Sequence, residues 1–416
     1  MLSRCAQTES NDLATFPSFE RFLEALGRSK PDILITYLDR LDDRLANFLP
    51  AMLKGLEGGA KENIAHEKVR YWVGTRQYLR QVIRYQRFAA NFDADLLERA
   101  SKAAIEVGDD VAVLHAVSIS AARHGDVTGG LIERVFLPAV DHLSVKGDTR
   151  WVNAVWPHAA KSSLFQDLKS EQADRVLASL VRHSQIDYHV EEVLTSVATS
   201  WPQKVVDFFG QRLKVEPMAD DIKHYEAIPY RFHGLHAPLA KIPEYLVEKA
   251  RSWFEEDKLL FTYRGGRLLS IVFPNFSAEF EHSLQNLLEG RDRADLEFIA
   301  KILRNYEGQS FTHGLCKAIM AMLPANDPLL DEIEVALDST GIVSGEFGFV
   351  EACRRKKTEL EPWLSDPRES VQSFARRHML SLDRQIATEQ RRSEEELELR
   401  KRDYSEIDDG RDKRNP

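Results

Sequence analysis

Apolar residues recur three or four positions apart along most of this chain, a spacing that places them on one face of a helix. The clearest stripes are Leu96, Leu97, Ala100, Ala103, Ala104 and Val107; Ile132, Val135, Phe136, Ala139, Val140 and Leu143; Ala173, Val176, Leu177, Leu180 and Val181; and Val190, Val193, Leu194, Val197 and Ala198. No comparable alternation of apolar and polar residues between turn signals indicates a strand. The pattern predicts an all-α protein.

Glycine and proline divide the stripes into short helices. Gly108 interrupts one of the early stripes, and Pro202 follows Trp201 at a position where the first turn of a helix tolerates proline. Asp327 offers a capping side chain just ahead of Pro328. The expected helices have about 12–16 residues and are joined by short loops, so neighbouring helices should run antiparallel.

A single amphipathic helix pair cannot bury its own apolar face, whereas stacked pairs bury it continuously. The pairs recur roughly every 35–45 residues, in the range of HEAT repeats, without a repeated consensus string. We therefore expect an α-solenoid of HEAT-like antiparallel helix pairs with irregular repeats. The segment after Asp366-Pro367 is the most HEAT-like, although a plain helix after a turn explains that segment equally well.

The pattern predicts four regions along the chain. Residues 1–90 form an N-terminal helical segment, in which residues 61–90 form one long helix rich in arginine and aromatic residues. Residues 91–386 form the solenoid. The apolar seam then fades, so residues 387–404 are expected to be a charged, solvated helix and residues 405–416 a disordered tail.

Composition narrows the functional classes. The 416 residues are 43% hydrophobic and 29% charged, which is ordinary for a folded protein. The net charge of −10 argues against broad non-specific DNA binding but leaves a local basic face open. Cys5, Cys316 and Cys353 form no disulfide framework or zinc spacing. Because neither a membrane-spanning stretch nor an apolar signal core is present, we expect a cytoplasmic protein without membrane contact.

Motifs for catalysis or metal binding are weak. The glycine-rich segment from Gly55 to Lys61 lacks the spacing of a phosphate-binding loop. His233 and His236 lie three residues apart beside glycine and proline, so packing within a loop is more probable than a metal site. His313 and Cys316 would share one helix face, where a cysteine among apolar neighbours is usually a core residue. We predict no catalytic residue, metal or cofactor. An enzyme with an unfamiliar site near these residues is the third hypothesis for function.

Arginines and aromatics are interleaved in the N-terminal segment. Arg76, Arg80, Arg84 and Arg87 have the spacing of one helix face, and Tyr71, Trp72, Tyr78, Tyr85 and Phe88 lie among them. Such a face suits phosphate contacts and base stacking, so a nucleic-acid-binding helical-repeat protein is the second hypothesis. The favoured interpretation is that these arginines pair with acidic residues of the neighbouring helix, since Asp and Glu are in excess.

Several C-terminal segments resemble a known family. They are Ala227–His236, Leu260–Leu269, Val343–Glu351, Trp363–Pro367 and Ile386–Glu396. Together they resemble the C-terminal helical-repeat region of bacterial STAND-type NTPases, which include NACHT-like members implicated in anti-phage defence. The resemblance covers roughly residues 225–404. It implies a sensor or recognition role, whereas the Walker motifs of the NTPase module are missing and no catalytic residue carries over.

The first hypothesis for function is therefore a non-catalytic scaffold that recognises a protein partner, plausible in a defence assembly. The binding residues we predict are the arginines Arg76, Arg80, Arg84 and Arg87 and the loop residues Tyr230, Arg231, His233 and His236. The identity of the partner stays open. The oligomeric state stays open too, because the charged C-terminal helix has a composition that also suits a coiled coil.

Overall fold

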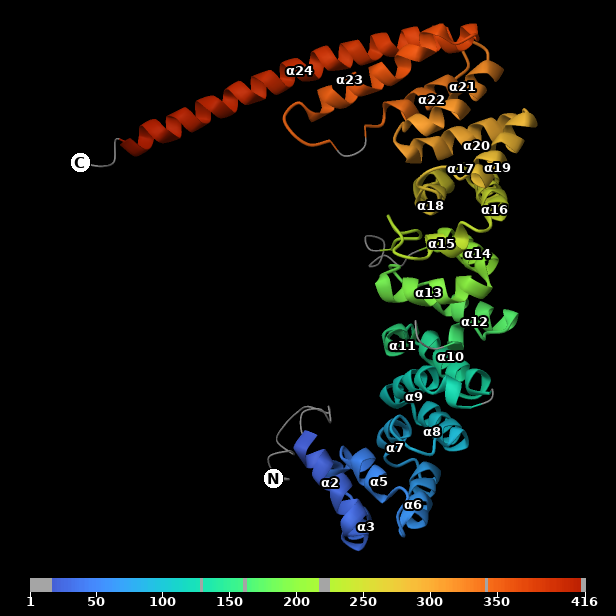
Figure 1. Ribbon diagram of the computed structural model, residues 1–416, viewed down its shortest axis with the longest axis vertical. Coiled ribbons are helices and arrows are strands. Elements are labelled where there is room, and N and C mark those ends of the chain that lie inside the picture. The colour runs from blue at the N-terminus through green and yellow to red at the C-terminus, as the bar shows by residue number, and fades with distance from the viewer. Residues whose placement is uncertain (1–16, 128–129, 160–162, 217–224, 341–342, 413–416) are drawn as a thin grey trace. The chain divides into compact units, whose positions relative to one another are not determined.

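The computed structural model describes residues 17–127, 130–159, 163–216, 225–340 and 343–412. Every regular element in these ranges is a helix, which confirms the all-α prediction (Figure 1). The chain divides into two compact units, Met1–Pro238 and Leu239–Pro416. The helices on either side of the predicted boundary at residue 90 pack on each other within the first unit.

The first unit is a double row of short helices. They are α2 (Pro17–Ser29), α3 (Pro31–Asp39), α4 (Asp43–Ala46), α5 (Leu49–Leu56), α6 (Glu62–Gly74), α7 (Leu79–Gln86), α8 (Ala94–Val107), α9 (Asp110–Ala122), α10 (Leu137–Val145), α11 (Trp151–Ala159), α12 (Ser170–Leu180), α13 (Tyr188–Ser200) and α14 (Pro202–Leu213), with α15 (His236–Leu239) at the boundary. Helices α5, α7, α9, α11 and α13 contact one another in sequence, and so do α6, α8, α10, α12 and α14. Each helix from α5 to α14 therefore packs against the helices two places away along the chain, whereas α2 packs against α5.

The predicted apolar stripes form the core between these rows. Val135, Phe136, Ala139 and Val140 have no exposed surface, and the stripes of α8, α12 and α13 are buried in the same way. The exceptions are Val107, which is 47% exposed at the last turn of α8, and Val181, which is half-buried after the last residue of α12. A π-helical turn at Ile132–Phe136 precedes α10, because Pro138 in the next turn cannot donate a backbone hydrogen bond.

The second unit is built from α16 (Pro243–Glu256), α17 (Lys258–Leu260), α18 (Arg267–Val272), α19 (Ala278–Glu289), α20 (Arg293–Leu303), α21 (His313–Met322), α22 (Leu329–Asp338), α23 (Gly348–Leu360) and α24 (Glu369–Asp412). Alternate helices pack together here too, since α18 contacts α20, α20 contacts α22 and α19 contacts α21. Helices α16 and α19, and α21 and α24, contact each other three places apart along the chain. Packing between alternate helices therefore occurs within both units, although the second unit also has contacts between helices three places apart.

The long helix predicted for residues 61–90 is two helices. Helix α6 ends at Gly74 and α7 begins at Leu79, and between them Arg76 and Tyr78 have left-handed φ angles of 59° and 51°. Such angles are uncommon for residues other than glycine. Contacts outside the segment hold this turn: the Tyr78 hydroxyl donates to the carbonyl of Leu41 at 3.1 Å, and its ring lies edge-on against Trp72.

The C-terminal helix crosses the predicted division at residue 387 without a break. Helix α24 runs unbroken for 44 residues from Glu369 to Asp412, so the expected disordered tail is helical up to Asp412. Residues 413–416 of that predicted tail lie outside the described residues. Among residues 369–402 of α24, the buried ones lie between Val371 and Leu382 and include Phe374.

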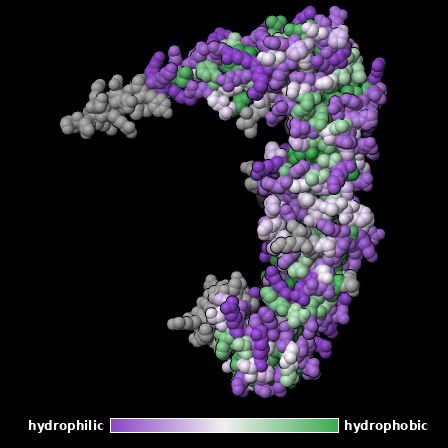
Figure 2. All heavy atoms as spheres, viewed as in Figure 1, coloured by the Kyte–Doolittle hydropathy of each residue, from purple (hydrophilic) through white to green (hydrophobic). Residues whose placement is uncertain are grey.

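Ion pairs join successive helix pairs along the surface. Examples in the first unit are Lys68–Asp39, Arg76–Glu106, Arg80–Asp109, Lys146–Asp110, Arg175–Asp141 and Lys204–Asp174. Their partners are 29 to 36 residues apart in the sequence. Two ion pairs join successive helices of the second unit in the same way. They are Lys258–Glu297 and Arg293–Asp327, whose partners are 39 and 34 residues apart. Hydrophilic residues predominate on the surface shown in Figure 2.

Within the described ranges, no helix combines the length and the apolar character that crossing a bilayer requires.

Two glycines let α2 and α5 approach closely, which generates a prediction. A Cβ atom added at Gly27 would lie 2.6 Å from the backbone carbon of Gly55. We expect Gly27→Ala to destabilise the contact between α2 and α5 by roughly 1–3 kcal/mol, the usual cost of overpacking. Hydrogen exchange across residues 17–56 should become faster.

Gly74→Ala is the matched control, because a Cβ atom there meets nothing within 4 Å. It should leave exchange unchanged or slow it slightly, since alanine favours helix by about 1 kcal/mol over glycine. Unchanged exchange in Gly27→Ala would contradict the close approach.

Candidate functional site

The predicted binding loop, Tyr230–His236, is anchored by a buried carboxylate. Glu191 in α13 is only 3% exposed, and its Oε1 accepts hydrogen bonds from the backbone N–H groups of His233 at 2.5 Å, Gly234 at 2.7 Å and Leu235 at 3.1 Å. Hydrogen bonds to a charged acceptor are stronger than neutral ones. The loop backbone is therefore fixed while four side chains remain exposed: Tyr230, Arg231, His233 and His236.

The anchored loop brings His233 into a cluster of surface rings, which we call the aromatic patch: Trp156, Tyr188, His189 and His233. The His233 ring lies 5.6 Å from that of Tyr188, and the Trp156 ring lies 4.4 Å from His189 and 6.4 Å from Tyr188. Trp156 is 38% and Tyr188 is 48% exposed. The patch joins α11, the first turn of α13 and the loop, all within the first unit.

Local sequence explains how the patch forms. Trp151, Val152 and Val155 bury the inner face of α11, which leaves Trp156 on its outer side. The Asp187 side chain caps α13 by accepting the backbone N–H of Val190 at 2.9 Å. Tyr188 and His189 consequently occupy the exposed first turn.

The apolar periodicity did not single out Trp156, Tyr188 or His189. A usable signal was present, because all three are aromatic residues out of phase with the buried stripes of their helices.

The predicted arginine stripe is brought together only in part. Arg76 lies in the turn before α7 and pairs with Glu106 at 2.6 Å. Arg80 and Arg84 lie in α7, and Arg87 follows its last residue. Nε of Arg80 donates to both carboxylate oxygens of Asp109 at 2.8 Å. The pairs made by Arg76 and Arg80 confirm, for these two residues, the expected pairing with acids of the neighbouring helices.

Three arginines of the stripe also act electrostatically on His115 in α9. Burial lowers the pKa of His115 to about 4, and the positive charges of Arg84, Arg80 and Arg87 contribute to the same shift. Asp109 opposes it. The imidazole of His115 is therefore neutral at pH 7, beside a group of guanidinium ions.

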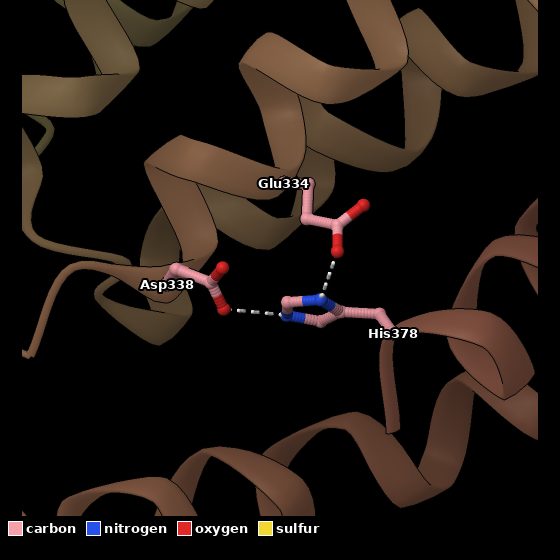
Figure 3. A group of neighbouring side chains, drawn as sticks. All are labelled: Glu334, Asp338 and His378. Atoms are coloured by element: carbon pink, nitrogen blue, oxygen red, sulfur yellow. Dashed lines mark ion pairs between the residues drawn. The ribbon is translucent and has the colours of Figure 1, made fainter. Parts of the chain in front are cut away.

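A third cluster lies in the second unit (Figure 3). Glu334 and Asp338 occupy successive turns of α22, and His378 of α24 lies between them. The His378 ring is fully buried, with Nδ1 3.5 Å from Glu334 Oε1 and Nε2 3.5 Å from Asp338 Oδ1. We call these residues the acid–histidine cluster. One ligand atom from each residue lies within 4.8 Å of the other two.

Two cations adjoin the acid–histidine cluster. Arg377 Nη2 lies 3.8 Å from Glu334 Oε2, and Lys356 interacts electrostatically with Asp338. The buried Lys356 ammonium donates to the backbone carbonyls of Leu337 and Ser339 at the end of α22. Burial raises the pKa of Asp338 above its ordinary value, the charge of Glu334 raises it further, and His378 and Lys356 oppose the rise. The cluster therefore brings two carboxylates, an imidazole and two cations close together in a partly buried environment.

The acid–histidine cluster was missed in the sequence, although a signal existed. His378 occurs four residues after Phe374 on the buried seam of α24, and Glu334 and Asp338 share one face of a helix at i, i+4 spacing. Their pairing links positions 40 and 44 residues apart, which periodicity alone does not reveal.

The Cys316 thiol is fully buried, and burial raises its pKa to about 12. Burial also lowers the pKa of His313 to about 4, and its ring lies edge-on against Trp363 at 5.0 Å. The thiol is therefore protonated at neutral pH and acts as a small packing group, as the sequence predicts.

No protein-family model, no curated protein and no solved structure matches this chain. The resemblance to the repeat region of STAND-type NTPases accordingly stays a prediction.

The environment of His115 predicts a pH dependence of stability. Because the folded protein binds this proton less tightly than the unfolded chain does, stability should fall as pH drops from about 6.5 to about 4 and then level off. His115→Gln should remove this contribution, roughly 1–3 kcal/mol. The melting temperature of the variant should therefore change less than that of the wild type between pH 6.5 and pH 4. The more exposed His66→Gln is the control, and identical pH profiles for both variants would refute the assignment.

The Glu191 anchor predicts a local effect on the loop. Glu191→Ala leaves three backbone N–H groups without their acceptor, so hydrogen exchange at residues 233–235 should accelerate and stability should fall by about 1–3 kcal/mol. Glu191→Gln should have a smaller effect, because an amide oxygen still accepts. The exposed Glu171→Ala in α12 should leave the loop unchanged, and equally protected amides in Glu191→Ala would show that another group holds it.

Proposed function

We propose that this chain is a HEAT-like α-solenoid that recognises a partner protein and does not catalyse a reaction. The packing of alternate helices supports the solenoid, since each helix pair buries its apolar face against the pairs before and after it. The ion pairs support it too, because the 29 to 36 residues between partners in the first unit approximate one helix pair.

The aromatic patch is the surface we propose for recognition, and it is the observation that carries the proposal. Tryptophan and tyrosine are enriched among residues that dominate binding energy at protein interfaces. Trp156 and Tyr188 contact each other at the surface while remaining 38% and 48% exposed. Glu191 holds the adjoining loop, so little conformational entropy is lost when a partner binds there.

A protein partner fits the charges of the first unit better than a nucleic acid does. Binding phosphate through the arginines requires Arg76 and Arg80 to leave Glu106 and Asp109. A recognition role is also what the resemblance to the repeat region of STAND-type NTPases implies, and we extend the proposal to a sensor-like part in a bacterial defence system.

The test uses the full chain as bait for affinity purification with mass spectrometry from native cells. Trp156→Ala with Tyr188→Ala should lose the proteins retained by the wild type and weaken a purified pair at least tenfold, the loss expected for removing two anchors. Tyr71→Ala, a 63% exposed tyrosine on α6, is the matched control and should retain them.

Equal retention by the double variant and the control would exclude the aromatic patch as the binding surface. A salt-sensitive electrophoretic shift with nucleic acid that Arg84→Ala and Arg87→Ala abolish would instead favour the second hypothesis.

A further inference from the structure

We propose that Glu334, Asp338 and His378 form a binding site for one divalent metal ion of the zinc class. The site lies wholly within the second unit and is independent of the aromatic patch. It would connect α22 to the first turns of α24.

The spacing of the three side chains fits a shared ion. Metal ligands at about 2.1 Å in a tetrahedral arrangement lie roughly 3.4 Å from one another. His378 Nε2 and Asp338 Oδ1 are 3.5 Å apart, and so are His378 Nδ1 and Glu334 Oε1 (Figure 3). Nε2 and Asp338 therefore already stand at ligand spacing. Glu334 faces the opposite ring nitrogen, Nδ1, and one of its oxygens lies within 4.8 Å of the other ligand atoms, so its side chain has to rotate toward Nε2 to complete the set.

The buried polar atoms of the cluster point to an occupant. Both ring nitrogens of the fully buried His378, and Oδ1 of Asp338, have no hydrogen-bond partner among the described atoms. Buried polar groups are nearly always paired, because leaving one unsatisfied costs free energy. An ion between Nε2 and Oδ1 satisfies two of these atoms at once.

The donor set selects the class of metal. Calcium and magnesium prefer sites made of oxygen atoms, whereas a buried imidazole with carboxylates suits zinc, cobalt or nickel. Arg377 and Lys356 bring positive charge to the same cluster, so we expect moderate rather than very tight affinity. The Lys356 ammonium also donates hydrogen bonds to the carbonyls of Leu337 and Ser339.

The experiment is a titration of the full chain with Zn²⁺ after exhaustive treatment with a chelator. Calorimetry should show one site of moderate affinity per chain, and the melting temperature should rise with zinc concentration because the ion binds the folded state. Co²⁺ should give the visible absorption bands of a tetrahedral complex. Asp338→Asn and Glu334→Gln, which preserve side-chain shape, should each weaken binding at least tenfold, and His378→Gln should do so too.

Asp331→Asn is the matched control, an exposed acid on the same helix, and should bind zinc as the wild type does. Far-UV circular dichroism of each zinc-free variant separates loss of ligand from loss of fold, and the two carboxylate variants decide the matter if His378→Gln does not fold. The chain has 13 histidines, so binding that survives in all three variants would place the metal elsewhere and overturn the proposal. Absence of a stoichiometric site in the wild type would overturn it as well, leaving a proton shared between His378 and the two carboxylates as the occupant.

Discussion

Burial of each helix's apolar stripe against helices two places away along the chain is the interaction on which this architecture depends. In the first unit, α9 contacts both α7 and α11, and Val113, Ala116 and Val117 on its inner face have no exposed surface. At about 25 cal/mol per Å² of apolar surface, such burial far exceeds the contribution of the exposed ion pairs, which is about 0–1 kcal/mol each. The ion pairs therefore set the register between helix pairs more than the stability of the stack.

The sequence predicts features that depend on residues close together in the chain, and it does not predict features that depend on distant residues. The stripe from Ile132 to Leu143 is visible because a helix repeats locally, and all its members are buried. The turn at Arg76 is not visible, because it depends on Tyr78 reaching the carbonyl of Leu41. The C-terminal helix was expected to change character at residue 387, where the apolar seam fades. Charged residues with i, i+4 partners such as Glu396 and Arg400 still favour helix, so the backbone continues.

The same reasoning applies to the candidate sites. Composition and residue type were enough to select the loop containing Tyr230 and His233 as unusual. Its anchor, Glu191, lies 42 residues earlier than His233 and resembles any other helical glutamate in the sequence. His378 similarly reads as one polar residue on an apolar seam until the fold places Glu334 and Asp338 beside its two nitrogens. Sites assembled from successive helix pairs require the stacking to be known first.

The unbroken length of α24 has a mechanical consequence. At 1.5 Å per residue, its 44 residues extend about 66 Å, and its backbone hydrogen bonds close within the helix itself. Its buried residues within 369–402 lie between Val371 and Leu382, and polar contacts continue further along, from Arg354 to Gln390 and from Arg400 to Glu346. A tilt of about 10° near Val371 would displace the far end by roughly 11 Å. A rotation near Val371 and Phe374 is therefore magnified along the length of α24.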